Sequence, residues 1–257
     1  MGTSSARRGP TGPFWRLAKR AASRYLSPGT AGRVSAREVA ARYVAALGEG
    51  GVPPDLAGAL AAFRLTRRVA QNLGAFYCQA ASRGWPAALD AWGLKEAAGE
   101  KVIAVPAHSL SAALEIPGGG LEQAVAHTAL VGLLLQQPPG GRGGGDFVPV
   151  PVPVPVPEAS RLVRRFLGDA FYLRLLLDLG ESLEAAAAGF SPLRQGSIEI
   201  SRWIERAATD PSLAAPHLRS PEDWLGLPGW TWVTGMLQGL LLHLRDLGSP
   251  QNSSGKI

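Results

Sequence analysis

Cysteine, histidine and charge are all scarce in this chain of 257 residues, and each scarcity excludes a class of protein. The single cysteine, Cys78, excludes a disulfide framework and a metal site built from thiolates. Charged residues make up 18% of the chain and hydrophobic residues 46%, so a wholly disordered chain is excluded as well. The four histidines stand singly, without the spacing of a zinc motif: His108, His127, His217 and His243.

Catalytic motifs are missing too. The glycine-rich stretch 140–145 lacks the Lys-Ser/Thr ending of a phosphate-binding loop, and no strand precedes it. No Gly-x-Ser-x-Gly elbow marks a nucleophile, and Cys78 is expected to be a small buried thiol. The sequence therefore predicts a protein that is not an enzyme and has no catalytic residues, no metal and no cofactor.

Basic charge is concentrated at the N-terminus. The formal net charge is +6, but residues 1–37 hold eight basic side chains and no acidic one, which leaves the remainder at −2. Because the body of the chain lacks a basic excess, we predict no nucleic-acid partner.

Residues 1–34 form a basic segment with helical periodicity after Pro13. An arginine-rich amphipathic helix without acidic residues is typical of an organellar transit peptide. It also suits a helix lying on an anionic membrane surface, and a basic disordered tail is the third alternative. The predicted apolar face holds Phe14, Leu17, Ala18, Ala21 and Tyr25, and the polar face holds Arg16, Lys19, Arg20 and Arg24.

Residues 35–137 are predicted to form an N-terminal helical region. Ser35 and Glu38 have the spacing of a capping box, and a long amphipathic helix is expected over residues 56–82. Such a helix wedged into one leaflet favours curvature, with its arginines at anionic head groups. The predicted membrane-binding residues are Leu56, Leu60, Phe63, Arg64, Arg67, Arg68, Leu73 and Tyr77.

Residues 138–157 are predicted to be a linker of glycines followed by Val-Pro repeats. Each proline removes a hydrogen-bond donor and biases the preceding valine to extended dihedrals, which favours polyproline II. Residues 102–105 form an extended run for which no partner strand is evident in the sequence.

Residues 158–248 are predicted to form a C-terminal helical region, followed by a tail at 249–257. Residues 158–188 have the pattern of one long helix, or of two joined near Gly180. The whole pattern predicts an all-α bundle of amphipathic helices with a Pro/Gly-rich central insertion and an apolar C-terminal helix.

That apolar helix is expected over residues 229–247, within a longer stretch that lacks charge from 224 to 244. Residues 229–244 rise only about 24 Å, against a hydrocarbon core of roughly 30 Å. Membrane insertion and burial in a protein core therefore remain equal alternatives. Gly235 and Gly239 have the small-xxx-small spacing of associating membrane helices, which predicts a homo-oligomer.

Several short stretches share features with one protein family. They are Tyr43 with Leu47, residues 65–69, residues 175–181, residues 204–210 and residues 233–235. In this order, along about residues 32–247, they resemble the peroxin-11 family of peroxisomal membrane proteins, which elongate the organelle before division.

The resemblance implies a non-enzymatic protein of the peroxisomal membrane that promotes peroxisome elongation, proliferation and division. Anionic membrane lipids, further copies of the chain and organelle division proteins are the partners it implies. The basic N-terminal segment instead points to a mitochondrion or plastid. The alternative function is therefore a soluble all-α scaffold or assembly factor imported there, whose amphipathic helices face each other.

Overall fold

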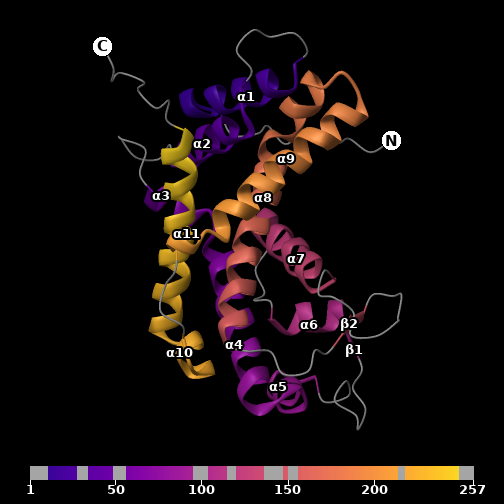
Figure 1. The fold of residues 1–257 in the computed structure, drawn as a ribbon, viewed down its shortest axis with the longest axis vertical. Coiled ribbons are helices and arrows are strands. Elements are labelled where there is room, and N and C mark those ends of the chain that lie inside the picture. The colour runs from indigo at the N-terminus through magenta and orange to yellow at the C-terminus, as the bar shows by residue number, and fades with distance from the viewer. Residues whose placement is uncertain are drawn as a thin grey trace. The chain divides into compact units, whose positions relative to one another are not determined.

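The computed structural model describes residues 11–27, 34–48, 56–94, 104–114, 120–135, 147–149, 156–213 and 218–248. These residues form helices and one pair of short strands, so the protein is all-α as predicted (Figure 1). The elements are α1 (Pro13–Leu26), α2 (Ala36–Leu47), α3 (Leu56–Ala61), α4 (Arg64–Arg83), α5 (Trp85–Ala91), β1 (Ala104–Pro106), α6 (Ala107–Leu114), α7 (Gly120–Leu135), β2 (Phe147–Pro149), α8 (Val156–Ala186), α9 (Phe190–Ala208), the 3₁₀ turn η2 (Pro211–Leu213), α10 (Pro221–Leu225) and α11 (Leu227–Gly248).

The chain divides into two compact units. Unit 1 comprises Met1–Ala61, Arg174–Ile204 and Leu241–Ile257, and unit 2 comprises Ala62–Leu173 and Glu205–Leu240. Helices α8, α9 and α11 each contribute residues to both units.

In unit 1, α1 packs along α2 (Figure 1). Helix α1 begins at Pro13, where the missing N–H costs no hydrogen bond. Helix α2 begins after Ser35, whose Oγ accepts the N–H of Glu38 at 3.2 Å, so the predicted cap is present. On α1, the small side chains of Ala18 and Ala22 are fully buried.

In unit 2, α4 is the central element. It contacts α5, α6, α7 and α10, and most of its surface is buried rather than one stripe of it. Its Gly74 faces the fully buried ring of Trp224, the aromatic residue of α10. Trp224 also makes an edge contact with Trp232 of α11, with ring centroids 5.0 Å apart. Trp224 therefore joins the core of unit 2 to both C-terminal elements.

The predicted helix over residues 56–82 is wrong as one element, because it breaks between α3 and α4 at Ala62 and Phe63. Phe63 is 1% exposed and stacks on Phe171, with ring centroids 6.1 Å apart. At the new helix start, the Glu122 carboxylate accepts the N–H of Thr66 at 3.0 Å. Tertiary burial and a cap supplied by another helix thus outweigh the local helical periodicity.

Residues 102–105 were expected to lack a partner strand, and this is also wrong. Strand β1 pairs antiparallel with β2, with Val105 opposite Val148. The partner lies in the stretch predicted to be linker, where alternate prolines leave few donors and so hide a strand from sequence patterns. The remaining described residues of that stretch, Val156 and Pro157, already belong to α8, which then runs unbroken through Gly180. The other linker residues lie outside the described ranges.

Helix α11 begins two residues before the predicted start, with Pro228 in its first turn. One face of it is buried in protein: Trp232, Val233, Met236, Leu237 and Leu240 in unit 2, and Leu241 and Leu244 in unit 1. Among the described helices, none combines the length and the apolarity that crossing a bilayer requires.

Candidate membrane-surface site

Helix α1 has one face locked into unit 1 and one basic face exposed. Its buried residues are Trp15, Ala18, Ala21 and Ala22, whereas Arg16, Arg20 and Arg24 are exposed. Leu17 was predicted on the apolar face but is 42% exposed among these arginines. Ala18 and Ala21 of the predicted face are buried, but so are Trp15 and Ala22, so the packed face is rotated away from Leu17.

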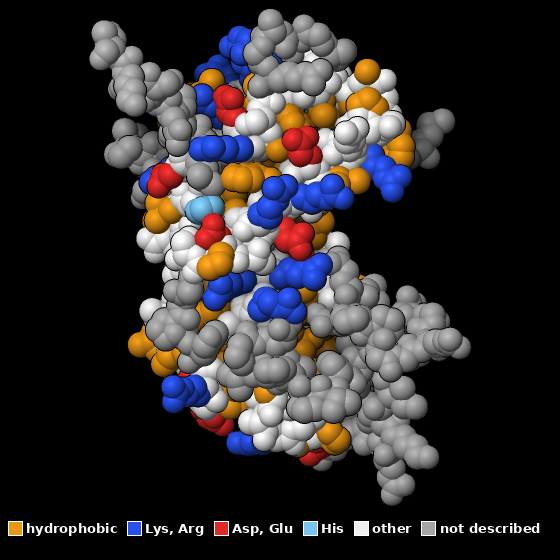
Figure 2. All heavy atoms as spheres, in the orientation of Figure 1, with side chains coloured by type: hydrophobic (Ala, Val, Ile, Leu, Met, Phe, Trp, Pro, Cys, Tyr) orange, Lys and Arg blue, Asp and Glu red, His pale blue; other side chains and the backbone are white. Residues whose placement is uncertain are grey.

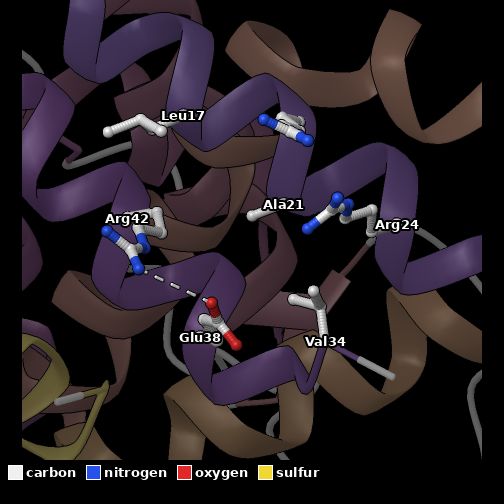
Figure 3. Close-up of a pocket in the computed structure, with 7 residues that line it drawn as sticks. Leu17, Ala21, Arg24, Val34, Glu38 and Arg42 are labelled. Carbon is white, nitrogen blue, oxygen red and sulfur yellow. Dashed lines mark ion pairs between the residues drawn. The ribbon is translucent and has the colours of Figure 1, made fainter. Parts of the chain in front are cut away.

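A pocket of about 160 Å³ lies between α1 and the start of α2 (Figure 3). In Figure 3, Arg24 and Arg42 lie on opposite sides of it, with Ala21 and Glu38 between them. The pocket is lined by Leu17, Arg20, Ala21, Arg24, Val34, Glu38 and Arg42. Three arginines and one glutamate thus line the pocket together with three apolar residues, which gives the lining a formal net charge of +2.

The charges of this pocket are only partly compensated. Arg42 Nη2 lies 3.7 Å from Glu38 Oε1 one helical turn away, and both side chains are well exposed. Within the described part of the chain, Arg20 and Arg24 have no ion-pair partner. An exposed i,i+4 pair contributes only about 0.3–0.5 kcal/mol, so Arg42 can exchange Glu38 for another anion at little cost.

Side chains of α1 contact the rest of unit 1 at several positions. Trp15 packs edge-on to Tyr43 of α2, with ring centroids 5.7 Å apart. The hydroxyl of Tyr25 donates a hydrogen bond to Glu199 Oε2 at 2.7 Å. Burial raises the pKa of Tyr25 above its usual value, and Glu199 raises it further, so this hydroxyl remains a donor at neutral pH. Ser23 Oγ donates to the carbonyl of Ser182 at 3.4 Å.

Tyr43 is held in turn by a hydrogen bond to α8. Its hydroxyl donates to Asp178 Oδ2 at 2.7 Å, and the same oxygen accepts from Arg174 Nε at 3.0 Å. Burial raises the pKa of Tyr43 well above its usual value, and the Asp178 carboxylate raises it further. The Tyr43 side chain that contacts Trp15 of α1 is therefore a neutral phenol held by hydrogen bonding.

The predicted membrane-binding residues of 56–82 are mostly placed inside protein. Leu56 and Leu60 are half-buried on α3 in unit 1. In unit 2, Phe63, Leu73 and Tyr77 are at most 1% exposed. In this conformation these three apolar side chains are not available to a lipid leaflet.

The three arginines predicted to meet head groups are likewise divided. Arg64 and Arg68 are exposed, whereas Arg67 is 8% exposed. Arg67 donates to Thr234 Oγ1 at 3.0 Å and lies 4.3 Å from the ring centroid of Trp230, which also lies 4.8 Å from Arg68. Burial lowers the pKa of Arg67, and Glu122 opposes this effect. Arg67 thus packs α4 against α11.

The predicted self-association pair is split as well. Gly235 is exposed, and a side chain there would meet nothing within 4 Å. Gly239 already lies against Leu213 of η2, since a Cβ built on it comes within 3.0 Å of that side chain. Of the two glycines predicted to mediate self-association, only Gly235 has free space where a Cβ would lie.

The described residues contain three arrangements to consider as a metal or catalytic site: clusters of metal ligands, the thiol of Cys78 and the contact of Ser111 with His127. No three His, Cys, Asp or Glu side chains within the described ranges lie close enough to hold a metal. Cys78 is buried, as predicted, and burial raises the pKa of its thiol. Ser111 Oγ lies 3.3 Å from His127 Nδ1, but Ser111 is fully buried and inaccessible to a substrate.

Sequence reasoning missed the pocket between α1 and α2. Its residues come from two segments whose approach the sequence does not specify. The detectable signals were Arg20 and Arg24 at i,i+4 spacing on one helix and Glu38 and Arg42 at the same spacing on the next.

No protein-family model, curated protein or solved structure matches this chain.

Proposed function

We propose that this chain is a non-enzymatic protein that attaches to the anionic surface of an organelle membrane through the basic face of α1. One observation carries the proposal: α1 is anchored in unit 1 on one side while Arg16, Arg20, Arg24 and Leu17 point outward on the other. This arrangement presents cations and one apolar side chain on a rigid support.

The expected strength of this attachment is modest. Each basic residue near an anionic surface contributes about 1 kcal/mol, so three arginines supply about 3 kcal/mol. Burying the exposed part of Leu17 adds at most about 1 kcal/mol. Attachment of this strength is peripheral and reversible, and a salt increase weakens it.

Membrane shaping is the activity that such attachment would serve, and the family resemblance favours peroxisome elongation and division at the peroxisomal membrane. On the face drawn in Figure 2, basic side chains lie among acidic ones. Self-association through the exposed Gly235 and recruitment of organelle division proteins belong to the same proposal.

A second candidate is the soluble all-α scaffold or assembly factor of a mitochondrion or plastid. The burial of Phe63, Leu73 and Tyr77 inside unit 2 favours it, because the amphipathic stripe of α4 is already used against neighbouring helices. A fluorescent fusion tagged at either end in turn separates the organelles. Entry of C-terminally tagged protein into mitochondria or plastids would contradict the peroxisomal proposal.

Vesicle flotation tests the attachment itself. The full chain is expected to float with phosphatidylcholine vesicles that contain phosphatidylserine and to sediment without phosphatidylserine. Replacing Arg16, Arg20 and Arg24 with alanine should abolish flotation. The matched control replaces the exposed arginines Arg194, Arg219 and Arg245 and should float. Equal loss in both triple variants, or no flotation of the unaltered chain, would refute the assignment of α1.

A further inference from the structure

We infer that the pocket between α1 and α2 binds a phosphate monoester. The inference rests on the proposed attachment of α1 to a membrane and adds a specific ligand chemistry to it. Its basis is the convergence of Arg20, Arg24 and Arg42 on one concave space that also contains an apolar floor.

The first step of the argument is charge. With Glu38 ionised, the seven lining residues carry a net charge of +2. A phosphate monoester carries about −1.5 to −2 at neutral pH, whereas a diester carries only one charge. The pocket therefore compensates a monoester more completely than a diester.

The second step is geometry. Arg20 and Arg24 are one helical turn apart on α1 and Arg42 belongs to α2, so arginines from two helices line the pocket. Figure 3 shows Arg24 and Arg42 on opposite sides of it. Guanidinium groups bind phosphate oxygens through paired N–H donors. The volume of about 160 Å³ is far above the roughly 10–15 Å³ that one water needs, so the pocket has room for more than a single water.

The third step is the role of Glu38. Its carboxylate is the single anion among the lining residues and is held near Arg42, where it occupies one guanidinium. A bound phosphate must compete with it, so Glu38 lowers the affinity of the empty pocket. Replacement of Glu38 by glutamine should therefore strengthen phosphate binding, which a purely structural role would not produce.

The floor of the pocket suggests how a monoester would be presented. Leu17, Ala21 and Val34 line the pocket beside the arginines, which suits the start of the acyl chains of phosphatidic acid. A soluble ester such as glycerol 3-phosphate carries the same phosphate chemistry without the acyl chains. The experiment therefore includes both sources.

The test compares binding of the full chain to phosphatidylcholine vesicles containing either phosphatidic acid or phosphatidylglycerol at matched surface charge. Tighter binding to phosphatidic acid is expected. Replacing Arg20 and Arg24 with alanine should weaken that binding about 30-fold, and E38Q should strengthen it about fivefold. The matched controls are R194A with R219A, and E184Q, which change the same charges at exposed positions away from the pocket.

The R20K/R24K variant retains the charge but loses the paired donors, so it should bind both vesicles equally well. Thermal unfolding of each variant verifies that the helices remain folded. Displacement of the chain from vesicles by glycerol 3-phosphate would support the pocket with a soluble ester as its ligand; its absence, with a retained phosphatidic-acid preference, would support the lipid.

Two results would overturn the pocket. One is equal binding to both anionic vesicles with attachment still dependent on α1, which leaves the proposed function standing. The other is an E38Q effect no larger than that of E184Q. Absence of binding to any anionic vesicle would instead refute the proposed function, together with the inference that rests on it.

Discussion

At the scale of single residues, Arg67 illustrates how a charged side chain in an amphipathic pattern can serve the interior. Its guanidinium lies against the ring of Trp230 and donates to Thr234, while Glu122 caps the first turn of the same helix through Thr66. A cation over an indole ring contributes about 0.5–2 kcal/mol, more when it is desolvated. Arg67 lies at the boundary between the predicted apolar and polar faces, whereas Arg64 and Arg68 lie on the polar face and are exposed.

Replacing Gly74 with alanine should destabilise unit 2. A Cβ at this position overlaps the ring of Trp224, which is fully buried and has no room to withdraw. Overpacking of this kind costs about 1–3 kcal/mol. Denaturant unfolding followed by tryptophan fluorescence measures the loss.

The matched control is Gly235→Ala on α11. Its Cβ meets nothing within 4 Å, and alanine is about 0.8–1.0 kcal/mol better than glycine inside a helix, so stability should rise. If G74A proved as stable as the unaltered chain, the close approach of Gly74 to Trp224 would be wrong.

Asp169 should make the stability of unit 2 depend on pH. Burial raises its pKa from the usual 3.8 to about 6, with Arg165 opposing and Glu205 assisting the shift. Because the folded carboxyl binds its proton more tightly than the unfolded one, stability falls as pH rises from about 4 to about 6 and then stays constant.

Asp169→Asn should therefore stabilise unit 2 by about 1–2 kcal/mol at pH 7 and change little below pH 4, after allowance for solvent screening. Urea unfolding of both proteins across this pH range provides the measurement. If the free energies of unfolding of the two proteins differed by the same amount at every pH, the pKa of Asp169 would not change on folding. Exposed Glu184→Gln serves as the control with no expected pH-dependent gain.

At the scale of the element, α1 combines a structural face and an exposed basic face. A transit peptide that is cleaved contributes no side chains to the core of the mature protein. Helix α1, in contrast, supplies buried side chains to unit 1 and contacts Tyr43, Ser182 and Glu199. This integration favours the membrane-surface alternative over a cleaved address for the part of the segment that forms α1.

Deletion of residues 1–27 should consequently unfold or strongly destabilise unit 1. Loss of the buried residues of α1 uncovers the aromatic ring of Tyr43 and the apolar face of α2. Hydrogen exchange should show that amides of α2 lose protection in the truncated chain. Retained protection there, or a mature protein in cells that begins after Leu26, would support the cleaved-address alternative.

At the scale of the whole molecule, the net charge says little about where a charged surface lies until it is divided by position. The +6 of the chain contains the eight basic residues of positions 1–37 and a remainder near neutrality. In the described structure, several of those basic residues gather on α1, next to Arg42 of α2. A local concentration of like charges raises the potential far more than a small net charge spread over a surface.

Attachment through α1 predicts a peripheral protein. Alkaline carbonate extraction of organelles should release the full chain into the supernatant, because the proposed attachment is mainly electrostatic. Release should also occur with high salt at neutral pH. Retention in the membrane pellet under both conditions would contradict peripheral attachment and favour insertion of the apolar C-terminal helix.

Several features followed from local sequence alone. The all-α class, the cap at Ser35 and the burial of Cys78 were predictable, whereas one helix or two near Gly180 remained open. Helical periodicity, capping side chains and the scarcity of β-forming runs act between residues that are close in sequence, so their signal does not need a tertiary contact.

The tertiary structure decided which faces meet. It broke the helix at Phe63, buried Arg67, paired β1 with β2 and left Leu17 outside the core. Each of these outcomes depends on a partner many residues away, such as Phe171 for Phe63 and Trp230 for Arg67. An apolar stripe on a helix predicts that this face is buried, but it can be buried equally well against lipid or against a neighbouring helix. Only the tertiary structure decides between the two.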